Sequence, residues 1–297
     1  MELRPSPNFD LAATLHSGQS FVWHEARIEG AAGFLGIIGG APVFTASSGD
    51  NLMFAGAAEG DVSRYLALDH DLSAIKASFP ADDPHLAEAV KFCPGLRILR
   101  QPKWECLASF ICSSLKQVTH IRQMSLTLRQ KFGERASLPD GTVVPLFPTA
   151  DALANEGEAA LRECGLGYRA KGLWRAAECI SRGEVDLKAL GDLEDGELCE
   201  SLCRLHGVGE KIAHCVMLFA YGRMAAFPVD TWVLRILKEW YFPRRRKPLR
   251  TRDCHEFARK HFGENAGYAQ QFLFHYARTS GVFVGKPRRA QKSSKIP

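Results

Sequence analysis

The sequence contains no pair of cysteines at the Cys-x-x-Cys spacing, although nine cysteines occur in its 297 residues. Structural zinc sites and iron–sulfur clusters depend on closely spaced thiolates, so neither is expected here. No carboxylate cluster or His/Cys spacing indicates a catalytic metal either. The cysteines occur singly and mostly in apolar helical contexts, as free buried thiols do in a reducing compartment.

Long apolar segments and internal repeats are also missing. No apolar run approaches the roughly 18 residues that a membrane-spanning helix needs. The first seven residues, Met1–Pro7, do not resemble a secretory signal. No similarity recurs at the spacing of a solenoid or propeller. We therefore expect a protein that contacts no membrane and that is a monomer.

The charge of the chain is mildly positive, at +5, and it is unevenly distributed. Much of it lies in the segment 244–252 and in the C-terminal segment 286–297. Such segments suit a polyanion, but a solvated loop and a solvated tail explain them equally well. The hydrophobic fraction of 46% is ordinary for a globular protein, so the charge alone does not identify a partner.

Short runs rich in β-branched and aromatic residues alternate with glycine-rich turns in the first part of the chain, which predicts an antiparallel meander. We expect Gly39-Gly40 to form a hairpin turn, because no Gly-Lys-Ser/Thr follows it as in a phosphate-binding loop. The predicted strands are 21–27, 33–38, 43–47 and 51–55. The predicted helices that follow them are 61–68, 72–79 and 84–92.

Beyond Cys93-Pro94-Gly95 the pattern is almost entirely helical, except for a Pro/Gly loop over 137–148. The predicted helices are 103–115, 117–132, 149–154, 158–164, 169–181, 195–204, 210–220, 231–241, 252–262 and 266–280. The fold class is therefore α+β. We predict an antiparallel sheet domain with flanking helices over 1–95, a helical domain over 96–285 and a basic tail over 286–297.

Two glycines lie one residue apart in Leu205–Ala213, between two predicted helices. We expect Gly207 and Gly209 to allow positive φ and close backbone approach, and the amides at the start of the second helix to suit a phosphate. Lys211 follows in the first turn of that apolar helix. Partial burial and the positive end of the helix dipole both disfavour an ammonium ion, so some free amine is expected there. A surface lysine that contacts phosphate is the simpler alternative.

Asp230 lies nineteen residues after Lys211, where Pro228–Trp232 predicts a helix start with a carboxylate at the N-cap. A free amine can attack a sugar carbon and form a Schiff base, and a fixed carboxylate can stabilise the positive charge that develops on the sugar when a base departs. An aspartate N-cap is also common for structural reasons alone. The lysine, the aspartate and the glycine turn together favour the catalytic interpretation.

These residues resemble the helix–hairpin–helix/Gly-Pro-Asp superfamily of DNA glycosylases. Within that superfamily the chain looks like an 8-oxoguanine DNA glycosylase/lyase of the eukaryotic type, which some bacteria also have. The resemblance covers nearly the full length and implies that the N-terminal sheet is TBP-like. It rests on four further segments in order: Gly18–Phe21 with Trp23, Phe110–Ser114, Gly165–Ala170, and Gly267–Gln270 with Phe274.

The resemblance implies a role for each matching residue. Lys211 is the expected nucleophile and Asp230 the catalytic carboxylate. The Gly18 carbonyl is expected to accept the N7 hydrogen that only the oxidised guanine carries, and Gln270 to read the Watson–Crick edge. Cys215 and Phe274 are expected to sandwich the flipped base. Lys211 and Cys215 are four residues apart on one helix, as are Gln270 and Phe274, so each pair shares a helix face. Without the resemblance, a core thiol, a core aromatic and a solvated glutamine would be the ordinary interpretations.

Other implied roles concern the DNA strands and the hairpin. Tyr168 and Arg169 resemble the pair that wedges into the duplex and contacts the orphaned base. Leu115 and His120 stand where the family has an asparagine and an arginine that contact the opposite cytosine, and Trp232 stands in place of a histidine near phosphate. The preference for cytosine opposite the lesion is therefore open. The hairpin carbonyls expected to hold a monovalent cation belong to Cys203, Leu205 and Val208; no cofactor is expected to be required for catalysis.

The sequence therefore predicts a bifunctional glycosylase and lyase that acts on double-stranded DNA containing an oxidised purine. Two alternatives remain: an alkylbase glycosylase of the same superfamily, which typically lacks the hairpin lysine, and a non-catalytic protein that binds DNA through the hairpin. The expected location follows the DNA, namely the bacterial cytoplasm or the eukaryotic nucleus.

Overall fold

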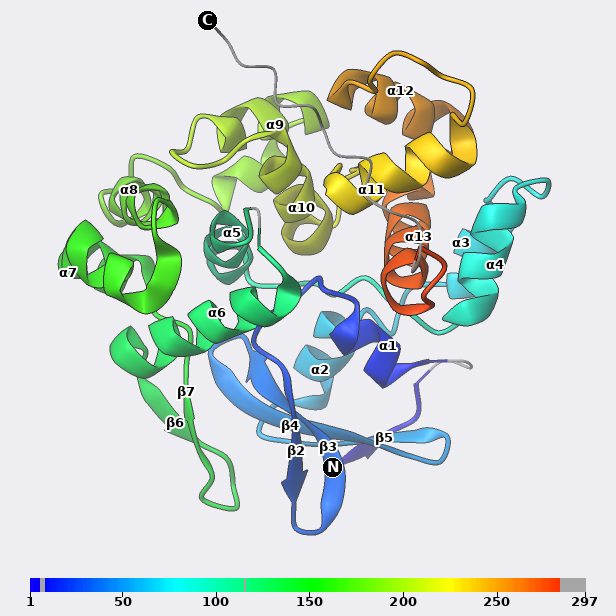
Figure 1. Cartoon of the computed structure of the whole chain (residues 1–297). Helices are drawn as coiled ribbons and strands as arrows, with labels where there is room; N and C mark the ends of the chain where they lie inside the picture. Colours follow the sequence, from blue (N-terminus) through cyan, green and yellow to red (C-terminus); the bar gives the residue numbers. More distant parts are fainter. Residues whose placement is uncertain (6–8, 115, 284–297) are drawn as a thin grey trace, which may run out of the picture.

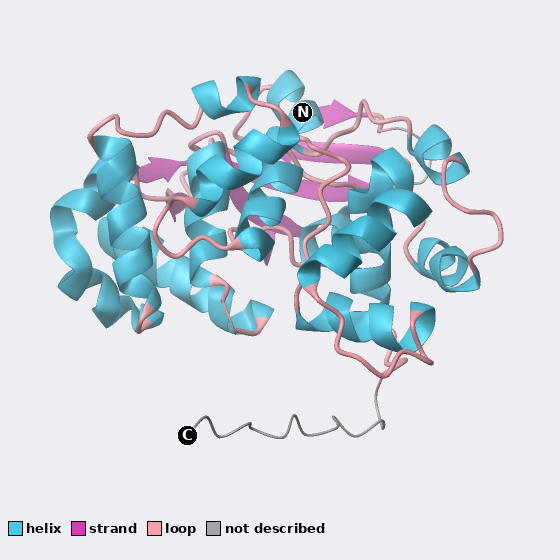
Figure 2. Cartoon of the chain, turned by 90° about the horizontal axis from the view of Figure 1, so that it is seen from above, coloured by secondary structure: helices cyan, strands magenta, loops and turns pink. Residues whose placement is uncertain are grey.

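The computed structural model describes residues 1–5, 9–114 and 116–283 (Figure 1). Leu115 and the predicted basic tail lie outside the described residues. The α+β architecture is confirmed, because an antiparallel sheet near the N-terminus is followed by a helical assembly. Figures 1 and 2 show most of the helices gathered on one side of the sheet. No helix of the described chain is long and apolar enough to cross a membrane.

The main sheet has five antiparallel strands in the order β1-β5-β4-β3-β2, so β2 to β5 form the predicted meander. Gly39 and Gly40 both have positive φ, 57° and 83°, and join β3 to β4 in a hairpin turn, as expected. The strands are β1 (Glu2–Leu3), β2 (His24–Ile28), β3 (Ala31–Ile38), β4 (Ala41–Ser48) and β5 (Asn51–Ala55).

Three features of this part differ from the prediction. The strand expected from residue 21 begins at His24, because Phe21, Val22 and Trp23 are buried against the core before the chain enters the sheet. β1 and the short helix α1 (Leu11–His16) were not predicted. The predicted loop 137–148 contains part of a hairpin, β6 (Arg135–Ser137) with β7 (Val143–Pro145). Strands of three residues are too short to show a period of two.

The apolar core consists of two adjoining clusters. One lies against the sheet and includes Trp23, whose ring packs over β3 so closely that a Cβ on Gly36 would come within 2.3 Å of it. Leu138 and Val144, which flank the β6–β7 turn, are buried in the same cluster. The other cluster lies among the helices and includes Leu86 of α4, which packs against α13. The position of the domain boundary stays a prediction.

The helices begin and end where capping residues and glycines occur. The Asp83 side chain accepts the Leu86 N–H at 2.9 Å, with Pro84 at the first helical position, and Gly222 ends α10 with φ 68°. Gly157, with φ 79°, kinks α7 between its two predicted halves. The helices are α2 (Glu59–Tyr65), α3 (Leu72–Ala77), α4 (Pro84–Phe92), α5 (Lys103–Cys112), α6 (Val118–Phe132), α7 (Ala150–Leu161), α8 (Arg169–Ser181), α9 (Asp195–Cys203), α10 (Glu210–Tyr221), α11 (Thr231–Ile236), α12 (Thr251–His261) and α13 (Ala266–Thr279). Short helices of other types cover Arg162–Leu166, Ala189–Asp192, Leu237–Tyr241 and Gly263–Asn265.

Candidate active site

The glycine turn joins α9 to α10, and its two glycines have different backbone conformations. Gly207 has φ +86°, and its Cα lies against Gly172 of α8, so that a Cβ on Gly207 would be 3.1 Å from the Gly172 Cα. Both the conformation and the close packing therefore require glycine. The expectation of positive φ is wrong for Gly209, whose φ is −110° and which is the extended N-cap of α10.

Lys211 lies in the first turn of α10, and its side chain reaches α5. Its Nζ donates a hydrogen bond to the Ser113 Oγ at 3.1 Å and lies 5.0 Å from the centroid of the Phe110 ring. The Ser113 hydroxyl in turn donates to the Phe110 carbonyl at 2.7 Å, so its lone pairs are left for the lysine. Two residues of the Phe110–Ser114 segment therefore hold the predicted nucleophile in place.

Asp230 caps α11 as predicted, because its Oδ1 accepts the Val233 N–H at 2.8 Å. Burial raises the pKa of this carboxyl, and the Val233 N–H and the charge of Lys211 act in the opposite direction. The predicted nucleophile and the predicted carboxylate are thus close enough to interact electrostatically, although they belong to different helices.

The thiol of Cys215 belongs to the same group of side chains. It is buried one helical turn after Lys211. Burial raises its pKa to about 11, while the charge of Lys211 and a hydrogen bond from it act in the opposite direction. Cys215 is therefore a neutral thiol at neutral pH, which suits contact with the face of an aromatic base.

The loop that carries Gly18 is held by buried hydrogen bonds. Gly18 has φ +85°, and the next side chain, Gln19, is fully buried. The Gln19 amide donates to the carbonyls of Thr14 and Arg97 and accepts the Leu99 N–H at 2.8 Å. This satisfied network gives a structural reason for the glutamine after Gly18 and makes the loop a rigid support.

The face of α13 that carries Gln270 and Phe274 lies against this loop. A Cβ on Gly18 would be 3.4 Å from the Phe274 Cε1. The predicted acceptor of the N7 hydrogen, Gly18, and one predicted wall of the base pocket, Phe274, are therefore neighbours. Gln270 is buried, and its Oε1 has no hydrogen-bond partner among the described residues. An acceptor left without a donor in a buried position is a feature of ligand-binding sites. Arg278 lies one turn further along α13, with its guanidinium carbon 5.3 Å from the centroid of the Phe274 ring.

The residues predicted to contact the opposite strand differ in how exposed their side chains are. Tyr168 is 60% exposed, as a wedging residue must be, and His120 is also exposed. The guanidinium of Arg169 is turned inward, where it donates to the carbonyls of Ser114 (2.8 Å from Nε) and Leu166 (3.3 Å). In this structure Arg169 thus supports the turn that precedes residue 115.

Trp232 lies near the start of α11, two residues after Asp230. Its ring is partly buried, with its centroid 6.3 Å from that of Phe283. The packing anchors Trp232 beside the predicted catalytic carboxylate. Its predicted DNA contact stays a prediction.

Two histidines that we did not predict support the loop before Asp230. Phe227 donates its N–H to the His214 Nδ1 at 3.1 Å, and its carbonyl lies 3.1 Å from the His255 Nε2. The two imidazole rings stack with their centroids 4.0 Å apart. No pattern in the sequence indicated this pair, because its members belong to α10 and α12.

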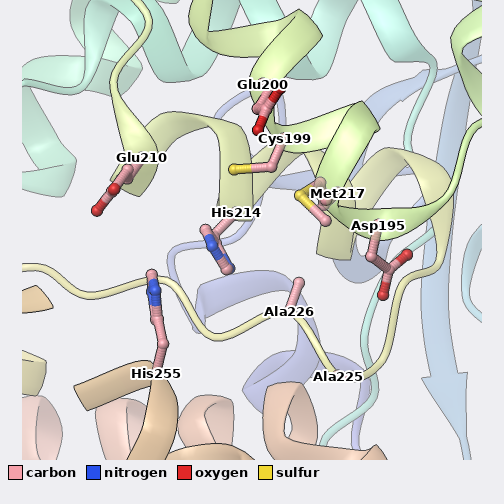
Figure 3. Close-up of a pocket in the computed structure, with 10 residues that line it drawn as sticks. Asp195, Cys199, Glu200, Glu210, His214, Met217, Ala225, Ala226 and His255 are labelled. Carbon is pink, nitrogen blue, oxygen red and sulfur yellow. The ribbon is translucent and has the colours of Figure 1, made fainter. Parts of the chain in front are cut away.

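A separate cavity of about 380 Å³ lies beside these histidines (Figure 3). None of its lining residues is one of the predicted site residues. They are Asp195, Gly196, Cys199, Glu200, Glu210, His214, Met217, Ala225, Ala226 and His255. Among the residues that the structure describes, no three His, Cys, Asp or Glu side chains are grouped so that they could hold a metal ion.

Two family descriptions match consecutive parts of the chain. Residues 3–107 match "8-oxoguanine DNA glycosylase, N-terminal domain", and residues 108–260 match "HhH-GPD superfamily base excision DNA repair protein". The chain belongs to the HhH-GPD superfamily of base excision DNA repair proteins.

Relatives of this HhH-GPD protein have similar sequences and structures. The N-glycosylase/DNA lyase OGG1 of Arabidopsis thaliana is 32% identical over 71% of the chain, which spans 60% of that relative's length. The yeast N-glycosylase/DNA lyase is 35% identical over 50% of the chain and 42% of its own length. The 8-oxoguanine glycosylase/lyase of Clostridium acetobutylicum, solved with double-stranded DNA containing cytosine opposite 8-oxoG, has a TM-score of 0.85 and 33% identity, covering 95% of this chain and 98% of that one. A 3-methyladenine DNA glycosylase of Archaeoglobus fulgidus, at 20% identity and a TM-score of 0.72, shares the fold.

Proposed function

We propose that this HhH-GPD protein is a bifunctional DNA glycosylase and lyase that removes 8-oxoguanine from duplex DNA. The observation that carries the proposal is the geometry of two groups: a 3.1 Å hydrogen bond fixes the Lys211 amine on the Ser113 hydroxyl, and the Asp230 carboxylate is fixed as the N-cap of the next helix. The adjoining face of α13, which lies against Gly18, supports a base-binding site there. The activities of the Arabidopsis N-glycosylase/DNA lyase and the Clostridium 8-oxoguanine glycosylase/lyase support the same activity and substrate.

The reaction begins when the glycine turn binds the phosphate backbone and the damaged nucleotide leaves the stack. The amine of Lys211 attacks C1′ of the sugar, and the bond between C1′ and N9 of the base breaks with its electron pair on the base. Asp230 stabilises the positive charge on the sugar while this happens. The Lys211 nitrogen loses one proton and O4′ takes up one as the sugar ring opens, which gives a protonated Schiff base. Loss of a C2′ proton then expels the 3′ phosphate.

The flipped base is recognised by groups from three parts of the chain. Gly18 offers its carbonyl to the N7 hydrogen, which distinguishes 8-oxoguanine from guanine. The orphaned Oε1 of Gln270 accepts from the Watson–Crick edge of the base. Cys215 and Phe274 provide the two walls.

The remaining predicted residues contact the DNA outside this pocket. Gly207 and Gly209 let the hairpin backbone approach a phosphate, and Trp232 packs near the same strand. Tyr168 enters the duplex, and Arg169 and His120 lie on the side of the orphaned base. A protein that acts on the chromosome belongs with it, in the nucleoid if the source is bacterial and in the nucleus if it is eukaryotic.

The hairpin also suits a monovalent cation. Cys203 is the last residue of α9, where carbonyls lack an intrahelical donor. The Leu205 carbonyl accepts the Val208 N–H at 3.1 Å and keeps a second lone pair. Three neutral carbonyls, from Cys203, Leu205 and Val208, are a donor set for a hard cation, which would add positive charge where the hairpin binds phosphate.

The test combines a chemical trap with base release. Borohydride reduces a Schiff base, so wild-type protein with a duplex that contains 8-oxoguanine should give a covalent complex. Lys211→Gln should give none, and Asp230→Asn should release base more slowly by about 10²-fold or more. Trapping of Lys211→Gln at the wild-type level would show that another residue is the nucleophile.

The same assay separates the alternatives. Release of an alkylated base without trapping would favour an alkylbase glycosylase. Structure-selective binding without release of any base would favour a non-catalytic binder. The likeness to the Archaeoglobus enzyme concerns the fold alone, so it favours neither alternative.

A further inference from the structure

Arg278 continues the face of α13 that carries Gln270 and Phe274, because the three residues are spaced four apart. One of its terminal nitrogens lies 3.0 Å from the position that a Cβ on Gly18 would occupy. The other donates a hydrogen bond to the His16 carbonyl. The guanidinium therefore lies beside both the predicted reader of the N7 hydrogen and a wall of the base pocket.

Among the described residues, no ion pair neutralises the charge of Arg278. Within the described part of the chain, no carboxylate lies within ion-pair distance of it, and its Nε is buried without a hydrogen-bond partner. Burial lowers the pKa of Arg278, the charge of Arg122 lowers it further, and Asp230 acts in the opposite direction. An arginine in a protein does not lose its proton, so Arg278 stays as positive charge beside the site.

Breaking the bond between sugar and base creates two opposite charges. The sugar becomes positive, and Asp230 is the group that stabilises it. The electron pair of the broken bond goes to N9 and is shared with the oxygen on C8, which lies next to N7 on the edge that Gly18 faces. The base finally takes up one proton and the Lys211 nitrogen releases one, so the step balances without another reactant.

We propose that Arg278 stabilises the negative charge that develops on the departing base, as the counterpart of Asp230 on the sugar. This assignment rests on the proposed function and adds a residue that acts on the leaving group. A fixed cation in a water-excluded site is effective because it needs no reorganisation when the charge appears. Arg278 thereby favours bases with an electron-accepting oxygen at the edge next to Gly18.

The experiment compares two steps that differ in whether a base leaves. Single-turnover release of 8-oxoguanine includes departure of the base, whereas cleavage of a duplex with a preformed abasic site does not. We expect Arg278→Gln to slow base release by about 10²-fold, the effect of removing one preorganised group of this kind. Cleavage of the abasic duplex should continue at the wild-type rate, and Arg278→Lys, which keeps the charge, should restore most of the base release.

Arg278 also holds the His16 carbonyl, so a structural role must be distinguished. If Arg278 acted only through the Gly18 loop, Arg278→Gln and Arg278→Lys would lose base release to the same degree, which would overturn the assignment. Equal loss of both steps in Arg278→Gln would overturn it as well. Arg182→Gln, which alters an exposed arginine paired with Glu178, serves as the matched control and should leave both steps unchanged.

The outcomes also separate this assignment from the proposed function. Absence of 8-oxoguanine release by the wild-type protein would overturn the proposed function, and the role of Arg278 with it. Normal release by both the wild-type protein and Arg278→Gln would overturn the role of Arg278 alone.

Discussion

His214 and His255 stack with their ring centroids 4.0 Å apart, and each binds a different backbone group of Phe227. The N–H of Phe227 requires an unprotonated Nδ1 on His214, and its carbonyl requires a proton on the Nε2 of His255. One residue therefore selects the tautomer of both rings. Phe227 lies three residues before Asp230, so the pair also sets the position of the loop that carries the proposed catalytic carboxylate.

The first prediction concerns the stability of this loop in acid. Burial lowers the pKa of His214 to about 4, with the charge of His255 acting in the same direction. The unfolded chain takes up this proton at an ordinary histidine pKa of about 6.5. The stabilisation is therefore complete above about pH 6.5 and is lost as the pH falls towards 4.

His214→Asn tests this stabilisation, because an asparagine oxygen can accept the Phe227 N–H but does not titrate. The free energy of unfolding of this variant, measured with denaturant, should fall less between pH 7 and pH 5 than that of the wild type. His214→Leu, the control, should lose about 1–3 kcal/mol at pH 7 because the N–H is left without an acceptor. Its free energy of unfolding should also fall less than that of the wild type between pH 7 and pH 5, because leucine does not titrate. An unchanged pH dependence in His214→Asn would contradict the interpretation.

The second prediction concerns Glu105, a buried carboxyl in the first turn of α5. Its Oε1 has no partner within the described chain, and burial raises its pKa to about 7, with Arg129 acting in the opposite direction. The folded state keeps a proton that the unfolded chain releases above an ordinary pKa near 4.5, so this group reduces the free energy of unfolding as the pH rises from 4.5 to 7.

Glu105→Gln removes the ionisation and keeps the shape. We expect it to be more stable than the wild type at pH 8, by up to about 3 kcal/mol, and to differ much less at pH 5. Denaturant unfolding at the two pH values measures the difference. A variant that is destabilised equally at both would show that the carboxylate has a partner that stabilises it.

The third prediction concerns the hydroxyl that holds Lys211. Ser113→Ala removes the acceptor of the Nζ hydrogen bond, so the amine should be oriented less often towards the sugar. We expect the rate of borohydride trapping to fall by about tenfold, as for a lost hydrogen bond to a charged group. Thr127→Ala removes an exposed hydroxyl of α6 and should trap at the wild-type rate; equal trapping by both variants would argue against a positioning role for Ser113.

The fourth prediction concerns the base opposite the lesion. His120 is exposed where the family resemblance expects an arginine, and Arg169 is occupied with the Ser114 carbonyl. We therefore expect excision rates to depend only weakly on which of the four bases is opposite 8-oxoguanine. His120→Arg should raise the preference for cytosine by about tenfold, since a good bidentate contact discriminates by about 1–3 kcal/mol. A strong cytosine preference in the wild type would show that Arg169 turns outward in the complex.

The parts of the fold that follow local signals could be predicted from the sequence. The capping residues Asp83 and Asp230, and the apolar period of α8, placed those helices correctly. The β6–β7 hairpin could not be predicted, because its short strands pack through Leu138 and Val144 against a distant sheet. The φ angle of Gly209 could not be inferred from its residue type, since glycine adopts extended conformations as well.

The candidate site, too, has features that local sequence signals predict and features that depend on the packing of distant segments. The order of its segments identified the superfamily, which the family comparison confirmed. The individual roles of Gly18, Gln270 and Phe274 stay predictions, although the structure brings them together. The Ser113 contact with Lys211 and the position of Arg278 depend on how α5, α10 and α13 pack, and no local pattern encodes that.

The burial of Cys215 has a consequence for survival under oxidative stress. The conditions that oxidise guanine also oxidise cysteine, and they attack the thiolate much faster than the thiol. A pKa of about 11 keeps Cys215 protonated, and its side chain is 3% exposed. Under the proposed function, the base pocket would contain a sulfur that hydrogen peroxide attacks only slowly when oxidised guanine becomes abundant.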